Sequence, residues 1–139
     1  MKNAVVRLGL WLIVVLLVSF SCKEEAEPLT AEQRVTGVLT SGTWKVKSLY
    51  IDGIESKAYA DLTLNFTTTS FTAANGVPMW PTTGTWSFLD DSAVAIKRND
   101  DVYLNLNVVD DNTLELNIFW SIPSTSFDPK GSHTFLLYK

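Results

Sequence analysis

The chain is poor in the residues from which metal sites and nucleophilic catalytic sites are built. Its 139 residues include one cysteine, Cys22, and one histidine, His133. A lone cysteine excludes an internal disulfide, and a lone histidine with no free thiol supplies neither a zinc cluster nor a Cys–His pair. The sequence also has no glycine-rich phosphate loop and no nucleophile elbow. We therefore expect a non-enzymatic protein without metal or cofactor, in which His133 lies on a strand surface.

Clusters of basic residues are absent as well. The chain has 11 Lys and Arg against 15 Asp and Glu. Removal of residues 1–21 as a leader takes away Lys2 and Arg7 but no acid, so 9 basic and 15 acidic residues remain, a formal net charge of −6. An acidic chain without a basic patch is a poor partner for nucleic acid or for an anionic lipid surface. We expect no nucleic acid partner.

No apolar run is long enough to cross a bilayer. The run from Leu8 to Phe20 spans 13 residues, whereas a membrane-spanning helix needs about 20. Lys2 and Arg7 precede this run, and the small Ser21 follows it. Such an arrangement is typical of a secretory signal peptide over residues 1–21.

The end of this leader resembles the lipobox of bacterial lipoproteins, in which a small residue precedes an invariant cysteine. Ser21 and Cys22 match those two positions, whereas Ser19 and Phe20 depart from the usual pattern. The resemblance implies that Cys22 is lipidated and anchors the chain to a membrane; the alternative is a small buried residue near an ordinary cleavage site. Lys23-Glu24-Glu25 resembles short signals that send Gram-negative lipoproteins to the outer face of the outer membrane, or is only a solvated tether. Residues 22–29 then form the tether, and residues 30–139 the domain.

A short helix is expected at the start of the domain. Thr30 and Gln33 have the spacing of a capping box, and Val35 and Val38 follow at helical spacing. Gly42 is suited to end the helix in a left-handed conformation.

From Thr43 the hydrophobic period changes from helical to two, which is typical of strands with one buried face. Turn residues such as Asp52-Gly53 and Asn75-Gly76 separate eight such runs, and no helical pattern interrupts them. Eight antiparallel strands in sequence order can close into a barrel that removes exposed edges. The predicted fold is therefore all-β: an eight-stranded antiparallel up-and-down barrel preceded by a short N-terminal helix. The runs are centred on Trp44–Ser48, Leu62–Phe66, Phe71–Ala73, Thr83–Phe88, Val94–Ile96, Val102–Val108, Leu114–Trp120 and Ser132–Lys139.

The order of these elements resembles the lipocalin pattern. Lipocalins open their first strand with Gly-x-Trp after a short helix, as Gly42-Thr43-Trp44 does here. Trp80-Pro81-Thr82-Thr83-Gly84-Thr85-Trp86 and Lys97-Arg98-Asn99-Asp100 resemble stretches of uncharacterised lipocalin-like domains of bacterial outer-membrane lipoproteins. The resemblance covers residues 38–139 and implies a fold and a location, but no activity.

Three acidic pairs recur at intervals of ten residues, at Asp90-Asp91, Asp100-Asp101 and Asp110-Asp111. In a meander the first and third pairs lie at one barrel end and the second at the other, so they do not share a metal. Asp side chains bond to nearby backbone in turns, which is the function we assign to these pairs.

The inward face carries large apolar side chains. It either fills the barrel as a packed core or leaves a small apolar pocket. The expected members are Trp44, Val46, Leu62, Leu64, Phe66, Phe71, Trp86, Phe88, Val94, Ile96, Val102, Leu104, Leu106, Leu114, Leu116, Ile118 and Trp120.

Long connections at one barrel end indicate where a ligand could bind, because binding residues concentrate on loops held by a scaffold. These connections cover residues 52–60, 75–82 and 122–131, and they either expose their apolar residues as an interaction surface or fold over the barrel mouth as a cap. We expect a surface-anchored lipoprotein that binds a small apolar ligand at this end; the alternative is a protein-interaction module, such as an inhibitor or accessory subunit of a surface complex, with a filled barrel. The candidate ligand residues are Tyr59, Met79, Trp80, Trp120 and Phe127.

Overall fold

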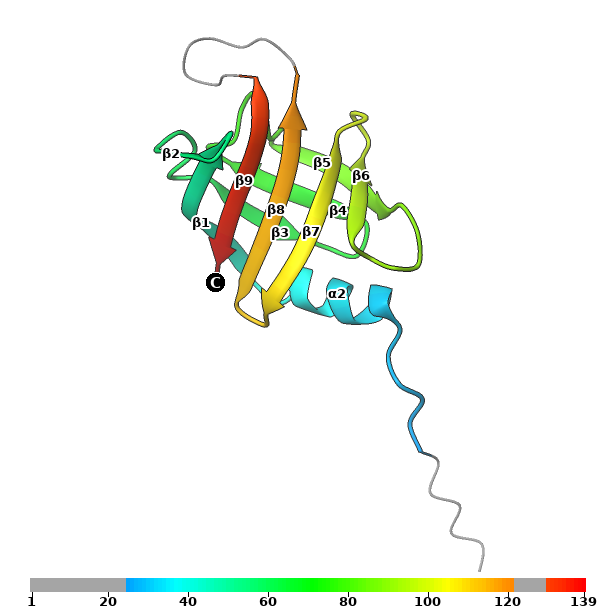
Figure 1. Ribbon diagram of the computed structural model, residues 1–139. Coiled ribbons are helices and arrows are strands. Elements are labelled where there is room, and N and C mark those ends of the chain that lie inside the picture. Colours follow the sequence, from blue (N-terminus) through cyan, green and yellow to red (C-terminus); the bar gives the residue numbers. More distant parts are fainter. Residues whose placement is uncertain (1–24, 122–129) are drawn as a thin grey trace, which may run out of the picture.

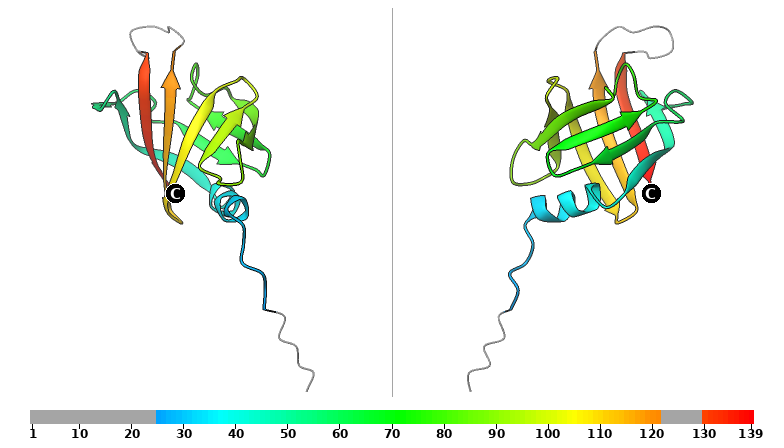
Figure 2. Two further views of the ribbon diagram at one scale, coloured as in Figure 1. Left: turned by 45° about the vertical axis from the view of Figure 1, so that its right-hand side comes forward. Right: turned by 180° about the vertical axis from the view of Figure 1, so that it is seen from behind.

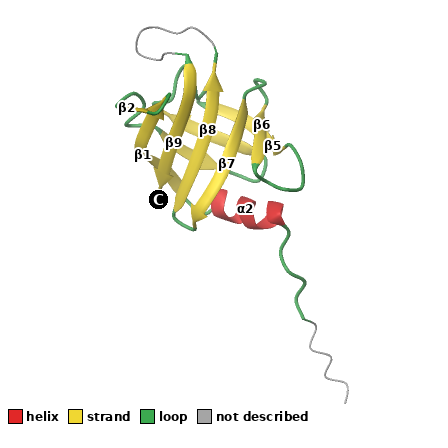
Figure 3. Ribbon diagram, in the orientation of Figure 1, coloured by secondary structure: helices red, strands yellow, loops and turns green. Residues whose placement is uncertain are grey.

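The computed structural model describes residues 25–121 and 130–139, and this part of the chain contains one helix followed by nine strands (Figure 1). Figure 3 separates the helix from the strands by colour. The elements are α2 (Ala31–Leu39), β1 (Thr43–Ile51), β2 (Ile54–Ser56), β3 (Thr63–Phe66), β4 (Ser70–Ala74), β5 (Thr83–Phe88), β6 (Ala95–Arg98), β7 (Tyr103–Asp110), β8 (Thr113–Trp120) and β9 (Gly131–Tyr138).

Eight of the strands form a closed antiparallel barrel, which confirms the predicted fold. Each strand from β3 to β8 pairs with the next, and β1 pairs with β3 on one edge and with β9 on the other. In Figures 1 and 2 the strands β3, β4 and β5 cross β7, β8 and β9 on the far side of the barrel. The core of the described residues lies between these two walls.

The remaining strand, β2, was not expected from the sequence. It forms a hairpin with the last part of β1, which continues past the edge occupied by β3. Asp52 and Gly53 make the turn, with φ of 49° and 83°. Positive φ at both central residues is what the tight turns of twisted hairpins require, and Asp-Gly tolerates it.

The helix α2 begins as predicted. The backbone N–H of Gln33 donates to Thr30 Oγ1 at 3.2 Å, and the Gln33 side chain accepts from the backbone N–H of Thr30 at 2.9 Å. The helix ends at Leu39, however, with Thr40 as its C-cap, and Gly42 does not adopt a positive φ. A hydroxyl-bearing cap that bonds back to Thr36 replaces the left-handed glycine that the sequence suggested.

The inward faces of the strands form the core largely as predicted. One member of the expected set, Val94, does not lie in the core. Val94 is 56% exposed because β6 begins only at Ala95. In β1 a bulge between Val46 and Ser48 shifts the alternation, so Leu49 points inward instead of Ser48. The other expected members that are only partly buried, yet pack against the core, are Val46, Phe88 and Val102.

The acidic pairs serve mainly in turns, as predicted. Asp90 Oδ1 accepts from the backbone N–H of Ser92 at 2.9 Å, and Asp110 Oδ1 accepts from that of Asn112 at 2.7 Å. The side chain and the backbone N–H of Ser92 donate to the ionised form of Asp90 and lower its pKa below the usual range. Asp100 differs, because its carboxylate pairs with a buried arginine.

Candidate functional site

The two ends of the barrel differ. The helix α2 lies across one end, beside the turn between β7 and β8 (Figure 1). Its last residue, Leu39, is fully buried, and its carbonyl accepts from Trp44 Nε1 at 3.0 Å. The opposite end, which we call the open end, is formed by residues 57–62, 75–82 and 99–102. Four of the candidate ligand residues, Tyr59, Met79, Trp80 and Trp120, lie there.

Three of the loop candidates fold inward instead of facing solvent. Tyr59 is 5% exposed, and Met79 and Trp80 are fully buried. The Trp80 ring lies 5.7 Å from the Phe71 ring and 6.5 Å from the Phe135 ring, centroid to centroid. Of the two alternatives for these residues, the structure excludes the exposed interaction surface, and the residues fold over the barrel mouth as a cap. The fourth loop candidate, Phe127, lies outside the described residues.

Trp120 belongs to the strand wall beneath this cap. It ends β8, is 4% exposed, and pairs across the ladder with Gly131. A cleft of about 380 Å³ opens beside it, and we call this the rim cleft. Its walls include Val102, Tyr103 and Phe119, and Phe119 is 75% exposed. The rim cleft thus connects the surface of the open end to Trp120.

The sequence interpretation missed Arg98, which is 1% exposed at the end of β6. Its guanidinium carbon lies 4.9 Å from the centroid of the Trp80 ring and 5.6 Å from that of Phe71. Its Nε donates to Asp100 Oδ1 at 2.9 Å, and its Nη2 donates to Asp100 Oδ2. This guanidinium holds the pKa of Asp100 below its usual range. The sequence does contain a signal for this burial, because Arg98 shares the inward period of Ile96 and Asp100 follows two residues later as a possible ion-pair partner.

His133 also lies in the core, not on the surface as predicted. It is fully buried on the inner face of β9, and its Nδ1 lies 3.1 Å from the carbonyl oxygen of Gly131. The period of two in β9 places His133 on the same face as Phe135 and Leu137, both of which are buried. Histidine as a residue type favours the surface, but the position of His133 on the inner face of the strand overrides that preference.

The four tryptophans of the barrel divide into two classes. Trp44 Nε1 donates to the carbonyl of Leu39, and Trp86 Nε1 lies 3.1 Å from the carbonyl oxygens of both Thr67 and Ser70. Trp80 Nε1 and Trp120 Nε1 are buried and have no acceptor among the described residues, and the same holds for Nη1 of Arg98. Buried polar groups are nearly always paired, so these unpaired donors need an explanation.

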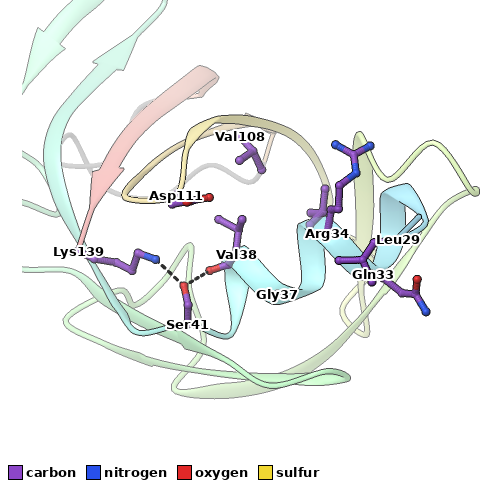
Figure 4. Close-up of a pocket in the computed structure, with 10 residues that line it drawn as sticks. Leu29, Gln33, Arg34, Gly37, Val38, Ser41, Val108, Asp111 and Lys139 are labelled. Carbon is purple, nitrogen blue, oxygen red and sulfur yellow. Dashed lines mark hydrogen bonds between the residues drawn. The ribbon is translucent and has the colours of Figure 1, made fainter. Parts of the chain in front are cut away.

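A second cleft, of about 560 Å³, lies at the opposite end of the barrel between α2 and the turn that joins β7 to β8; we call it the helix cleft (Figure 4). Val38 and Val108 face each other across it. Arg34 and Lys139 lie toward its two ends, and Asp111 lines it between them.

The described residues hold no group of three or more His, Cys, Asp and Glu side chains that could bind a metal ion. Within the same residues, no helix has the length and apolar character needed to span a membrane. Comparison of the chain with family models, curated proteins and solved structures finds no match to any of them.

Proposed function

We propose that this protein is a lipid-anchored, non-enzymatic binding protein that takes a small, largely apolar molecule at the open end of its barrel. The supporting observation is the set of unpaired, buried N–H donors of Trp80, Arg98 and Trp120. A buried donor without an acceptor costs about 1–3 kcal/mol. A ligand that brings an acceptor recovers this cost on binding, and Tyr103 and Phe119 offer apolar walls beside Trp120.

The ligand class follows from these groups. Trp120 Nε1 is the unpaired donor whose residue lines the rim cleft, and Asp100, which also lines it, already balances the charge of Arg98. A ligand with a carbonyl, ether or hydroxyl oxygen on an apolar body fits this set. Because Met79 and Trp80 close the barrel mouth, the ligand enters at the rim cleft and not a deep central cavity.

The test is equilibrium binding of fluorescent fatty-acid and bile-salt probes to the chain from Glu25. Trp120→Phe removes one unpaired donor and is expected to weaken binding about fivefold, the equivalent of roughly 1 kcal/mol. The matched control is Trp44→Phe, which alters a tryptophan whose N–H is already satisfied by Leu39. Equal affinities of the wild type and Trp120→Phe, or no uptake of any probe, would overturn the proposal.

The location proposal is tested separately. We propose that Cys22 carries the lipid and holds the domain at the outer membrane, on the grounds of the leader and the lipobox-like Ser21-Cys22. Two or more acyl chains at one residue give firm attachment, whereas one holds weakly. Mass spectrometry of the N-terminal peptide is expected to find an acylated Cys22, and Cys22→Ala is expected to release the protein from the membrane fraction.

The filled interior favours a second candidate function, a protein-interaction module of a surface complex. Several large apolar side chains remain exposed around the open end: Ile54, Val77, Tyr103 and Phe119. This function predicts that no small probe binds and that cross-linking to a surface partner on intact cells is lost in Phe119→Ser. Probe binding that depends on Trp120 would decide against it.

A further inference from the structure

The helix cleft lies at the other end of the barrel from the ligand site proposed above. Its volume of about 560 Å³ falls within the range of small-molecule sites, which are mostly apolar with a few polar groups that orient the ligand. The apolar side chains come from both sides: Val35 and Val38 from α2, and Val108 from β7. Leu29, which precedes the helix, adds a further apolar side chain that is 63% exposed.

Gly37 keeps this cleft open. Gly37 lines the cleft, and no atom lies within 4 Å of a Cβ built at this position, so a side chain added here would enter open space at the cleft. Glycine inside a helix is destabilising relative to alanine. Glycine at position 37 therefore lowers the stability of the helix, but its missing side chain leaves the groove open.

The charges of the cleft favour an anion at its ends. Arg34 and Lys139 contribute two cations and Asp111 one carboxylate. Lys139 is held in place, since its Nζ donates to Ser41 Oγ and lies 4.9 Å from the centroid of the Trp44 ring. Arg34 is exposed and is free of any ion pair within the described residues. The mature chain is acidic overall, so this attraction is local to the cleft.

The position of the cleft brings it close to acyl chains. Leu29 is seven residues from Cys22, and seven extended residues span at most about 25 Å. If Cys22 is lipidated, the cleft is held near the membrane surface. Only this placement near a membrane depends on the proposed location, and binding by the cleft in solution does not.

We propose that the helix cleft binds an acyl chain with an anionic head group, with the chain against Val35, Val38 and Val108 and the head group at Arg34. A long-chain carboxylate in solution and the acid of a membrane lipid share this chemistry. The site is distinct from the open end, so the two proposals can fail independently.

The test uses a dansyl-labelled undecanoic acid and the chain from Glu25, with three variants. Gly37→Leu fills the cleft, and a loss of affinity of at least about tenfold is expected, the equivalent of roughly 1.4 kcal/mol. Gly37→Ala adds one methyl group and is the matched control, with affinity expected to stay near the wild-type value. Both variants are expected to raise the melting temperature, because alanine and leucine favour helix over glycine. A loss of binding therefore does not reflect unfolding.

Arg34→Gln tests the head group. It is expected to weaken binding of the carboxylate probe but not of its methyl ester. Flotation with vesicles that contain an anionic phospholipid separates the two sources. If Gly37→Leu abolishes binding to the vesicles but not to the free probe, the ligand is a membrane lipid. If it abolishes binding to the free probe but not to the vesicles, the ligand is a fatty acid. If Gly37→Leu binds both as the wild type does, or if Trp120→Phe alone removes binding, the cleft is not the site.

Discussion

Replacing Trp120 by phenylalanine should not lower the stability of the domain, whereas the same replacement of Trp86 should. The two side chains are matched in burial, at 4% and 5% exposed. They differ in hydrogen bonding, because Trp86 Nε1 has two carbonyl acceptors at 3.1 Å and Trp120 Nε1 has none in the described structure. Comparing the two substitutions isolates the indole N–H from the loss of ring volume.

The expected magnitudes follow from separate contributions. Both substitutions shrink the ring by a few tens of Å³, and at about 24 cal/mol per Å³ the residual cavity costs roughly 1 kcal/mol. Trp86→Phe also loses its hydrogen bonds, at about 1 kcal/mol, and leaves the carbonyls of Thr67 and Ser70 without this donor. Trp120→Phe instead removes a donor whose burial costs about 1–3 kcal/mol. We expect Trp86→Phe to destabilise by about 2 kcal/mol and Trp120→Phe to leave stability unchanged or higher.

Urea denaturation followed by far-UV circular dichroism measures both free energies of unfolding. For a domain of this size 1 kcal/mol corresponds to about 4–8 °C in melting temperature, so the two variants should differ by roughly 10 °C. Trp44→Phe is a second control, since the Trp44 N–H donates to Leu39 at 3.0 Å and its loss should resemble that of Trp86. If Trp120→Phe loses as much stability as Trp86→Phe, the Trp120 N–H is satisfied in the free protein, and the reasoning behind the ligand site is refuted.

Three further predictions concern other parts of the domain. Thr30→Ala removes the N-cap of α2 and should lower the free energy of unfolding by about 1 kcal/mol, measured by urea denaturation. The folded-state pKa of Asp100 lies below its ordinary value of 3.8 because Arg98 donates to the carboxylate. The stability from this pair is therefore present above about pH 4 and is lost as the pH falls through the lower folded-state pKa. Acid titration of Asp100→Asn should show a smaller loss of stability in that range than the wild type. Gly76→Ala places a Cβ 2.9 Å from Leu62 Cδ1 and against the Trp80 side chain; it should destabilise by about 1–3 kcal/mol and change the near-UV circular dichroism spectrum, and an unchanged spectrum would contradict the packing of Trp80.

The barrel could be predicted from the sequence because its signals are local and repeated. Alternation such as Leu62, Leu64 and Phe66 fixes a strand and its buried face together. The capping box at Thr30 fixes the start of the helix by side-chain chemistry alone. Closure followed from the number and spacing of strands, since a meander of eight leaves two edges that pair with each other.

The burial of the loop residues could not be predicted in the same way. Residues 75–82 show no period, so whether Met79 and Trp80 face solvent or the barrel depends on distant partners such as Phe71 and Phe135. A single added residue had a similar effect in β1, where the bulge exchanges Ser48 for Leu49 on the inner face. Alternation assigns faces only while the register holds, and it says nothing where the chain leaves the sheet.

The filled interior determines how the two proposed sites relate. Trp44 and Leu39 close the barrel at the helix end, and Trp80 closes it at the open end, all three fully buried. A ligand in the rim cleft therefore meets the side of Trp120 and does not reach α2, and an acyl chain in the helix cleft lies outside the ring of strands against Val38 and Val108. Because packed cores move little, occupation of one cleft should leave the affinity of the other unchanged. A deep lipocalin-type cavity would instead force ligands from the two ends to compete for the same space.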